Sequence, residues 1–171
     1  MSLSDIATVA SILNTVAVVA TLVVLIISIR QNTQSQKVVA VQSLTAAIAA
    51  INVPAMTSPA LGAALARATR DWAGATREER IIAHYFLFTY FKLAEQAWYQ
   101  HQAGVLDDAQ WAGWEGGVRM FYHSAGVKQV WWPNRHGAYS PAFQAHMAAT
   151  QPPSGMGTMD AIFDFEPQAA G

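Results

Sequence analysis

The chain has 171 residues, of which 53% are hydrophobic and only 12% are charged, about half the charged fraction of a typical soluble domain. Its formal net charge of −1 excludes the basic footprint with which proteins bind nucleic acid. The absence of cysteine is compatible with a reducing and with an oxidising compartment.

The first long segment, residues 6–29, carries no charged side chain in 24 residues. As a helix it would be about 36 Å long, more than the bilayer core of about 30 Å. This segment predicts a single transmembrane helix, with residues 1–29 as the anchor and the lipid bilayer as the first partner. A buried core helix remains an alternative, because the strongest apolar run covers only residues 16–29. A cleaved signal peptide is not expected, because no basic side chain precedes the apolar run.

The charges that flank this segment predict its orientation. Asp5 precedes the segment, whereas Arg30 and Lys37 follow it. Cytoplasmic flanks carry an excess of Lys and Arg, so we expect the N-terminus outside and the remaining chain in the cytoplasm.

One face of the expected span carries small and polar side chains. Ala10, Asn14, Ala17 and Thr21 follow a 4-3-4 spacing and therefore share a helix face. Helices in lipid associate through small residues and amide groups of this kind. The face predicts contact with a second copy, in a homo-oligomer, or with a subunit of a membrane complex.

The helix should continue beyond the membrane, since residues 30–53 contain no Gly or Pro. Val41, Leu44, Ile48 and Ile51 form an apolar stripe of helical period. Pro54 should end the helix, because the residue before a proline avoids the α region. A second membrane segment within residues 38–66 remains open, although the 16 residues before Pro54 are short for a span.

The rest of the chain shows helix signals and no strand pattern. Capping residues predict four helix starts, and Gly or Pro residues predict three helix ends. The starts are at Ser58-Pro59, Thr76 with Glu79, Asp107 and Ser140-Pro141, and the ends are at Gly104, Gly126 and Pro133. The pair Gly116-Gly117 inside one helix should let a neighbouring ring or helix approach closely. We therefore expect an all-α chain in which the transmembrane helix is continuous with a small soluble helical bundle.

Residues 30–149 should form this cytoplasmic domain, and residues 150–171 should form a flexible acidic tail. After Arg135 the chain contains no Lys or Arg, and its acidic residues are Asp160, Asp164 and Glu166. The segment 159–165 alternates acidic and apolar side chains, a pattern of short interaction segments or of a frayed chain end.

The sequence contains no motif that predicts a catalytic residue, a metal ligand or a bound cofactor. The five histidines form no H-E-x-x-H or E-x-x-H pattern, and the chain has no nucleophile elbow and no phosphate loop. Glu95 lies in an aromatic helix, where a buried carboxylate needs a cation such as Lys92, Arg119 or Arg135. Glu95 could act as a general base or metal ligand, but a structural ion pair is favoured because no second acid stands beside it.

Trp131, Trp132 and Arg135 form a candidate partner surface, because Trp and Arg are enriched at interaction hot spots. Ordinary core filling by the two tryptophans is an equal alternative.

After the segment that ends in Arg30-Gln31, aromatic and turn residues follow one another in a characteristic order. They are Phe91, Glu95, Trp98, Gly104, Leu106, Asp107, Trp111, Gly126, Val127, Trp131, Trp132, Arg135, Ser140, Pro141 and Phe143. This order resembles a widespread family of functionally unassigned bacterial single-span membrane proteins with a small helical cytoplasmic domain. The resemblance implies this architecture in the bacterial inner membrane and carries no activity with it.

Two classes of function remain. The first is a membrane-tethered accessory or interaction subunit that associates, through its transmembrane helix and aromatic domain, with itself or with a larger membrane complex. The alternative is a small-ligand-binding protein or metal-dependent enzyme with a pocket between aromatic helices. The single span with its small and polar side chains, the low charge of the soluble part and the tail support the first class.

Overall fold

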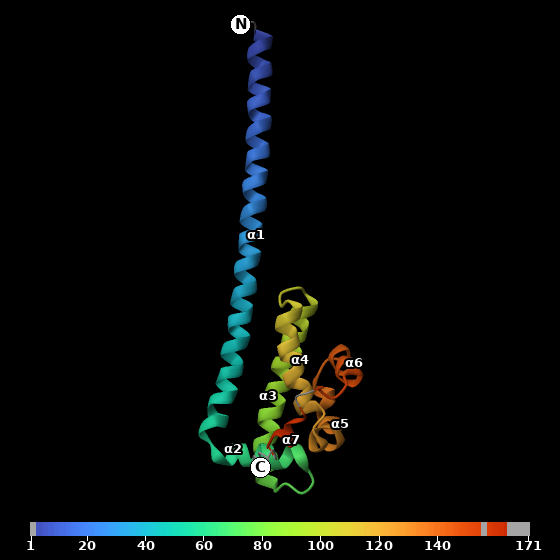
Figure 1. Ribbon diagram of the computed structural model, residues 1–171. Coiled ribbons are helices and arrows are strands. Elements are labelled where there is room, and N and C mark those ends of the chain that lie inside the picture. Colours follow the sequence, from blue (N-terminus) through green and yellow to red (C-terminus); the bar gives the residue numbers. More distant parts are fainter. Residues whose placement is uncertain (1–2, 155–156, 164–171) are drawn as a thin grey trace, which may run out of the picture. The chain divides into compact units, whose positions relative to one another are not determined.

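The computed structural model describes residues 3–154 and 157–163, and every regular element in these ranges is helical (Figure 1). The expectation of an all-α chain, with a long apolar N-terminal helix before a small helical domain, is confirmed. The elements are α1 (Leu3–Thr57), α2 (Pro59–Arg70), α3 (Arg77–Gln102), α4 (Asp108–Tyr122), a π-helical turn (Val127–Trp131), α5 (Trp132–Arg135), a 3₁₀ turn (His136–Ala138), α6 (Pro141–Ala149) and α7 (Met159–Phe163).

Residues 1–41 and 42–171 form two compact units, and α1 contributes to both. In the first unit the apolar side chains of α1 are open to solvent; Leu13 is 64% exposed, Val24 63% and Ile29 57%. Among the helices that the structure describes, α1 is the one that is long and apolar enough to cross a membrane.

The core of the second unit is built around α3, which places both aliphatic and aromatic side chains inside. Phe91, Phe143 and Met147 are fully buried there. The apolar stripe predicted at the end of α1 is confirmed, since Leu44 is buried and Ile48 and Ile51 pack against the core. Residues 38–66 do not form one helix, because α1 ends at Thr57 and α2 begins at Pro59.

The four predicted helix starts are confirmed. The side chains of Ser58, Thr76, Asp107 and Ser140 each accept a hydrogen bond from a backbone N–H three residues later. Thr76 and Glu79 complete a capping box, as do Asp107 and Gln110. Beyond the end of α3, Gly104 adopts a φ of 68°, the left-handed conformation that glycine tolerates without strain.

Three predicted helix ends are wrong, at Pro54, Gly126 and Pro133. The chain stays helical through Pro54 to Thr57, because proline restricts its neighbour without forbidding a helix. α4 already ends at Tyr122, and Gly126 instead lies against the backbone of α2. Pro133 occupies the first turn of α5, where its missing N–H needs no partner.

The part of residues 150–171 that the structure describes lies on the second unit. Arg119 donates from Nε to the carbonyl of Gln151 at 2.8 Å and from Nη2 to the carbonyl of Pro152 at 3.1 Å. Met159, at the start of α7, packs against the core, and α7 contacts α2. Asp164 and Glu166 of the predicted acidic tail lie outside the described residues.

Candidate functional site

Neither tryptophan of the proposed partner surface lies on the surface. Trp131 is 2% exposed and Trp132 is 7% exposed, so the alternative of core filling is correct for both rings. A short α-helix would turn one of two adjacent residues outward. Here the wider π-helical turn at Val127–Trp131 reduces the angle between successive side chains, and both rings enter the core. Arg135 remains exposed.

Arg135 lines a surface cleft with a face of α3, which we call the arginine cleft. Its volume is about 340 Å³, and its lining residues are Trp72, Arg77, Arg80, Ile81, His84, Tyr85 and Arg135. The five residues from α3 follow a spacing of i, i+3, i+4, i+7 and i+8, which places them on one side of the helix. A smaller cavity of about 170 Å³ shares Trp72 and Arg135 with this cleft.

The three guanidinium groups of the cleft are not neutralised within the described part of the chain. Arg80 donates to the carbonyl of Ala73 at 3.2 Å, and Arg135 donates to the carbonyl of Asn134 at 3.2 Å. In residues 3–154 and 157–163, no carboxylate forms an ion pair with Arg77, Arg80 or Arg135. The cleft therefore presents positive charge to whatever enters it.

Apolar and aromatic groups stand beside these charges. Tyr85 is 68% exposed and Ile81 is 42% exposed, while Trp72 is partly buried. Guanidinium groups bind carboxylates with two parallel hydrogen bonds and also stack on aromatic rings. The arrangement suits a segment that carries both acidic and aromatic side chains.

His84 connects the cleft to the core. Its Nδ1 accepts a hydrogen bond from the indole N–H of Trp131 at 3.2 Å, so the neutral ring carries its proton on Nε2. The pKa of His84 lies below its ordinary value because burial and the charge of Arg135 both disfavour a protonated ring.

Glu95 is 9% exposed and forms bonds through both carboxylate oxygens. Its Oε1 accepts from the backbone N–H of Ser140 at 2.6 Å, and its Oε2 accepts from Lys92 at 2.9 Å. Lys92 also donates to the carbonyl of Ala138 at 2.5 Å and lies 4.6 Å from the ring centroid of Tyr139. These bonds tie α3 to the start of α6, so the carboxylate has a structural partner on each oxygen.

The pKa of this carboxyl group follows from the same contacts. Burial alone would raise the pKa of Glu95, but the hydrogen bonds from Ser140 and Lys92 outweigh burial and hold it below the ordinary value. Lys92 is one of the three cations that the sequence offered as partners. Arg119 instead binds the carbonyls of Gln151 and Pro152, and Arg135 lines the arginine cleft.

Within the described ranges, no three His, Asp or Glu side chains come together in a way that could hold a metal ion. Two of the histidines instead lie beside one carboxylate each. His101 lies 3.0 Å from Asp108, and His146 lies 3.6 Å from Glu115.

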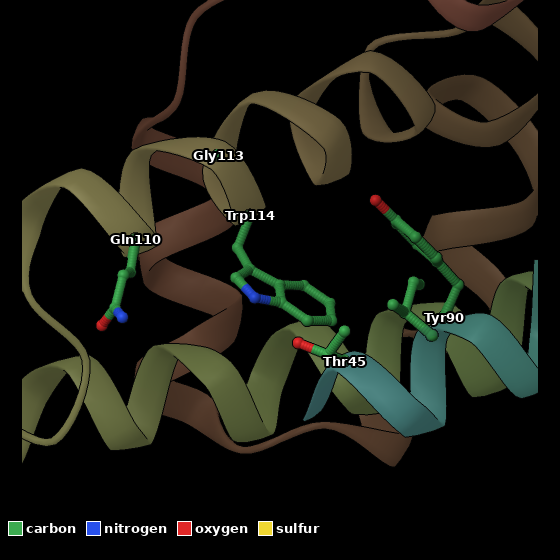
Figure 2. A pocket seen from close by; sticks show the side chains of 6 residues that line it. Thr45, Tyr90, Gln110, Gly113 and Trp114 are labelled. Atoms are coloured by element: carbon green, nitrogen blue, oxygen red, sulfur yellow. The ribbon is translucent and has the colours of Figure 1, made fainter. Parts of the chain in front are cut away.

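A second pocket lies between aromatic helices of the same unit. It has a volume of about 340 Å³ and is lined by Thr45, Ile48, Tyr90, Gln110, Gly113 and Trp114. Figure 2 shows the indole of Trp114 reaching from α4 toward Thr45 of α1, with Tyr90 of α3 beside it. Tyr90 is 8% exposed, and burial raises its pKa to about 12, so its hydroxyl keeps its proton.

Gly117 explains how Tyr90 fits against α4. A Cβ atom at Gly117 would lie 2.6 Å from the Tyr90 hydroxyl oxygen, closer than such atoms can approach. The expectation that the Gly116-Gly117 pair admits a neighbouring ring is therefore confirmed at Gly117.

The small-residue face of α1 belongs to the first unit. Asn14, Ala17 and Thr21 are exposed there, and the Thr21 hydroxyl donates to the carbonyl of Ala17 at 2.9 Å. The side chain of Ala10 lies outside the described part.

Sequence reasoning identified Arg135 but missed Trp72, Arg77, Arg80, His84 and Tyr85. The spacing from Arg77 to Tyr85 shows one mixed basic and aromatic face of a helix, which was the available signal. Its pairing with Arg135 depends on the tertiary fold. No family model matches the chain, and no curated protein or solved structure is similar enough to it to indicate a relative.

Proposed function

We propose that the protein is a single-span membrane-anchored interaction subunit. The observation that carries this proposal is the apolar surface of α1, which from Leu13 to Ile29 is covered by nothing in the described chain. Exposure of apolar surface to water costs about 25 cal/mol per Å², and the bilayer core removes this cost for a helix of this length. The resemblance to single-span proteins of the bacterial inner membrane is a second reason for the proposal.

The helical domain lies in the cytoplasm in this proposal. Arg30 and Lys37 follow the apolar segment directly, and Lys and Arg are enriched on the cytoplasmic side of spans. A reporter enzyme fused after Gly171 should therefore show cytoplasmic activity, and periplasmic activity would reverse the orientation.

Two surfaces serve association. The face with Ala10, Asn14, Ala17 and Thr21 contacts another transmembrane helix, from a second copy or a partner subunit. The arginine cleft contacts an acidic segment of a partner protein, because its guanidinium groups lack carboxylate partners within the described residues.

Alkaline carbonate extraction tests the anchor. Full-length protein should remain in the membrane pellet, and deletion of residues 1–29 should release it. Full-length protein in the supernatant would refute the proposal.

Crosslinking in intact membranes followed by mild-detergent purification tests the interaction. Wild-type protein should capture a partner that the Arg77→Gln/Arg135→Gln variant captures much less, while Lys128→Gln, which changes an exposed cation outside the cleft, should behave as wild type. Equal capture by all three proteins would exclude the arginine cleft as the contact surface.

The pocket at Trp114 supports a second candidate function, the binding of a small apolar ligand with a hydrogen-bond acceptor. Its lining combines Trp114 and Ile48 with the protonated hydroxyl of Tyr90. Mass spectrometry of protein purified in mild detergent tests this function. A ligand that is lost in Trp114→Ala would support it, and identical spectra for both proteins would count against it.

A further inference from the structure

We propose that the arginine cleft is the binding site for the acidic C-terminal segment of this same chain, residues 164–171. This inference rests on the proposed function, because it assigns an internal ligand to the cleft that also receives a partner. The segment lies outside the described residues.

The cleft and the C-terminal segment carry opposite charges. Arg77, Arg80 and Arg135 converge on one cleft and have no carboxylate partner in the described residues. Outside the described residues the chain carries two acidic side chains, Asp164 and Glu166, which follow Phe163 in a stretch without Lys or Arg. A carboxylate that entered the cleft would gain charge-assisted hydrogen bonds from guanidinium groups.

Shape and polarity agree with the charges. Tyr85, Ile81 and Trp72 give the cleft an apolar wall beside the arginines. Phe165 stands between Asp164 and Glu166 in the sequence, so the segment brings an aromatic ring together with two carboxylates. Both sides of the proposed contact therefore combine an aromatic group with charged groups, and the charges on the two sides are opposite.

The segment 164–171 begins directly after α7, which contacts α2 beside the cleft residue Trp72 in the sequence. α7, which ends at Phe163, contacts α2, and α2 leads at its C-terminal end to Trp72 in the cleft. A helix of 12 residues such as α2 is about 18 Å long. Glu166 is three residues beyond Phe163, which adds about 10 Å of extended backbone, and the long Arg and Glu side chains shorten the remaining distance.

In this contact residues 164–171 occupy the arginine cleft of their own chain. An acidic partner segment would then bind only by displacing residues 164–171, so the tail would lower the apparent affinity for the partner. Removal of the tail should expose the cleft.

Disulfide trapping in the full-length protein in detergent tests the contact. The chain has no cysteine, so two introduced cysteines are its only thiols. One pair joins Tyr85→Cys in the cleft with Gln168→Cys. The control pair joins Tyr99→Cys with Gln168→Cys, because Tyr99 is an exposed tyrosine on the same helix about 21 Å further along.

Under mild oxidation the Tyr85 pair should form an intramolecular disulfide about tenfold faster than the control pair, as expected for a raised effective concentration. A pair of Ile81→Cys with Gln168→Cys should repeat the result without removing Tyr85. Neutralisation of the tail by Asp164→Asn and Glu166→Gln should abolish the difference, and 1 M salt should reduce it by screening the charges.

Equal rates for the two pairs would overturn the proposal, as would a difference that survives neutralisation of the tail. A disulfide-linked dimer as the main product would also overturn it, because the cleft would then receive the tail of a second copy. These failures leave the proposed function intact, since partner capture and membrane extraction are measured separately.

Discussion

The indole of Trp131 donates a hydrogen bond to Nδ1 of His84 across 3.2 Å, joining a fully buried ring to the wall of the arginine cleft. Protonation of His84 at Nδ1 would convert an acceptor into a second donor facing the indole N–H. Burial and Arg135 already lower the pKa of His84, so this bond is intact when the ring is neutral.

The stability of the helical domain should fall on mild acidification. His84, His123 and His146 all have a lowered pKa, in each case with burial as the largest cause. Unfolded histidines take up protons as the pH falls below about 6.5, whereas these native rings stay neutral to a lower pH. The unfolded state therefore binds more protons in that range. The contribution of these histidines to the free energy of unfolding should therefore decrease from pH 7 downward and level off below their native pKa values.

The variant His84→Asn tests how much His84 contributes to this pH dependence of stability. An amide oxygen can replace Nδ1 as acceptor, and it does not titrate. Thermal unfolding of the full-length protein in detergent should show a shallower decrease between pH 7 and 5.5 than wild type. A wild-type midpoint that rises over this range would contradict the prediction.

Gly126 should be among the positions least tolerant of substitution. A Cβ atom there would lie 2.0 Å from the carbonyl oxygen of Ala68 and 3.0 Å from backbone atoms of Thr69 and Trp72. Backbone atoms cannot rotate away, so Gly126→Ala should destabilise the domain by about 3 kcal/mol, the upper end for an overpacked core. The measurement is chemical denaturation followed by tryptophan fluorescence.

Gly113→Ala is the matched control, since Gly113 lies inside α4 with no atom within 4 Å of the added methyl group. It should stabilise the domain by up to about 1 kcal/mol, the gain of alanine over glycine in a helix. Gly117→Ala should fall between the two, because it meets the side-chain hydroxyl of Tyr90. Equal changes in stability at Gly113 and Gly126 would contradict the close contact with α2 as the reason for the glycine at position 126.

The sequence predicted local features well, because caps depend on residues within one turn. Thr76 with Glu79 and Asp107 with Gln110 bond over three residues, so their partners are visible in the sequence. The burial of both Trp131 and Trp132 was not predictable in this way. It depends on a π-helical turn, whose extra residue per turn has no clear sequence signal here.

The candidate site was only partly predictable for a related reason. Arg135 was identified as a surface residue, but its neighbours in the cleft come from α3 and from Trp72, far away in the sequence. The role of Gly126 was likewise hidden, because the close approach that requires a glycine is made by α2. The spacing of residues in a sequence predicts which side chains share one face of a helix, but it does not predict which two helices pack together.

Glu95 should contribute to stability mainly through its bond to the backbone of Ser140. Glu95→Ala leaves that partly buried N–H without an acceptor and should cost about 1.5–3 kcal/mol, the range for hydrogen bonds to charged groups. Glu95→Gln keeps an acceptor and should cost less. Lys92→Gln should cost under about 1 kcal/mol, because the Lys92 side chain is 39% exposed and solvent screens its ion pair.

Urea denaturation of the three variants gives the comparison. The order of losses should be Glu95→Ala, then Glu95→Gln, then Lys92→Gln. An equal loss in Lys92→Gln and Glu95→Ala would mean that the ion pair, and not the Ser140 bond, holds α3 to α6.

The polar face of α1, the proposed membrane span, gives the last prediction, and Asn14 is its central residue. Thr21 satisfies its hydroxyl within the helix by donating to the carbonyl of Ala17, whereas an amide in a span is costly unless it also bonds to another helix. Ala10 and Ala17 share the face and are small enough to permit close approach. Asn14→Leu should therefore weaken helix association by about 0.6–2 kcal/mol and shift a native-gel or crosslinked species toward smaller assemblies.

Ala10→Leu and Ala17→Leu should have the same effect through steric obstruction, whereas Val19→Leu, on the opposite face, should leave assembly unchanged. If Asn14 instead lies near the outer headgroups it can bond to water, and its substitution will have no effect on assembly. Should all three variants on the polar face assemble as wild type does, α1 acts as an anchor alone. Association would then depend on the helical domain, where the arginine cleft is the surface to mutate next.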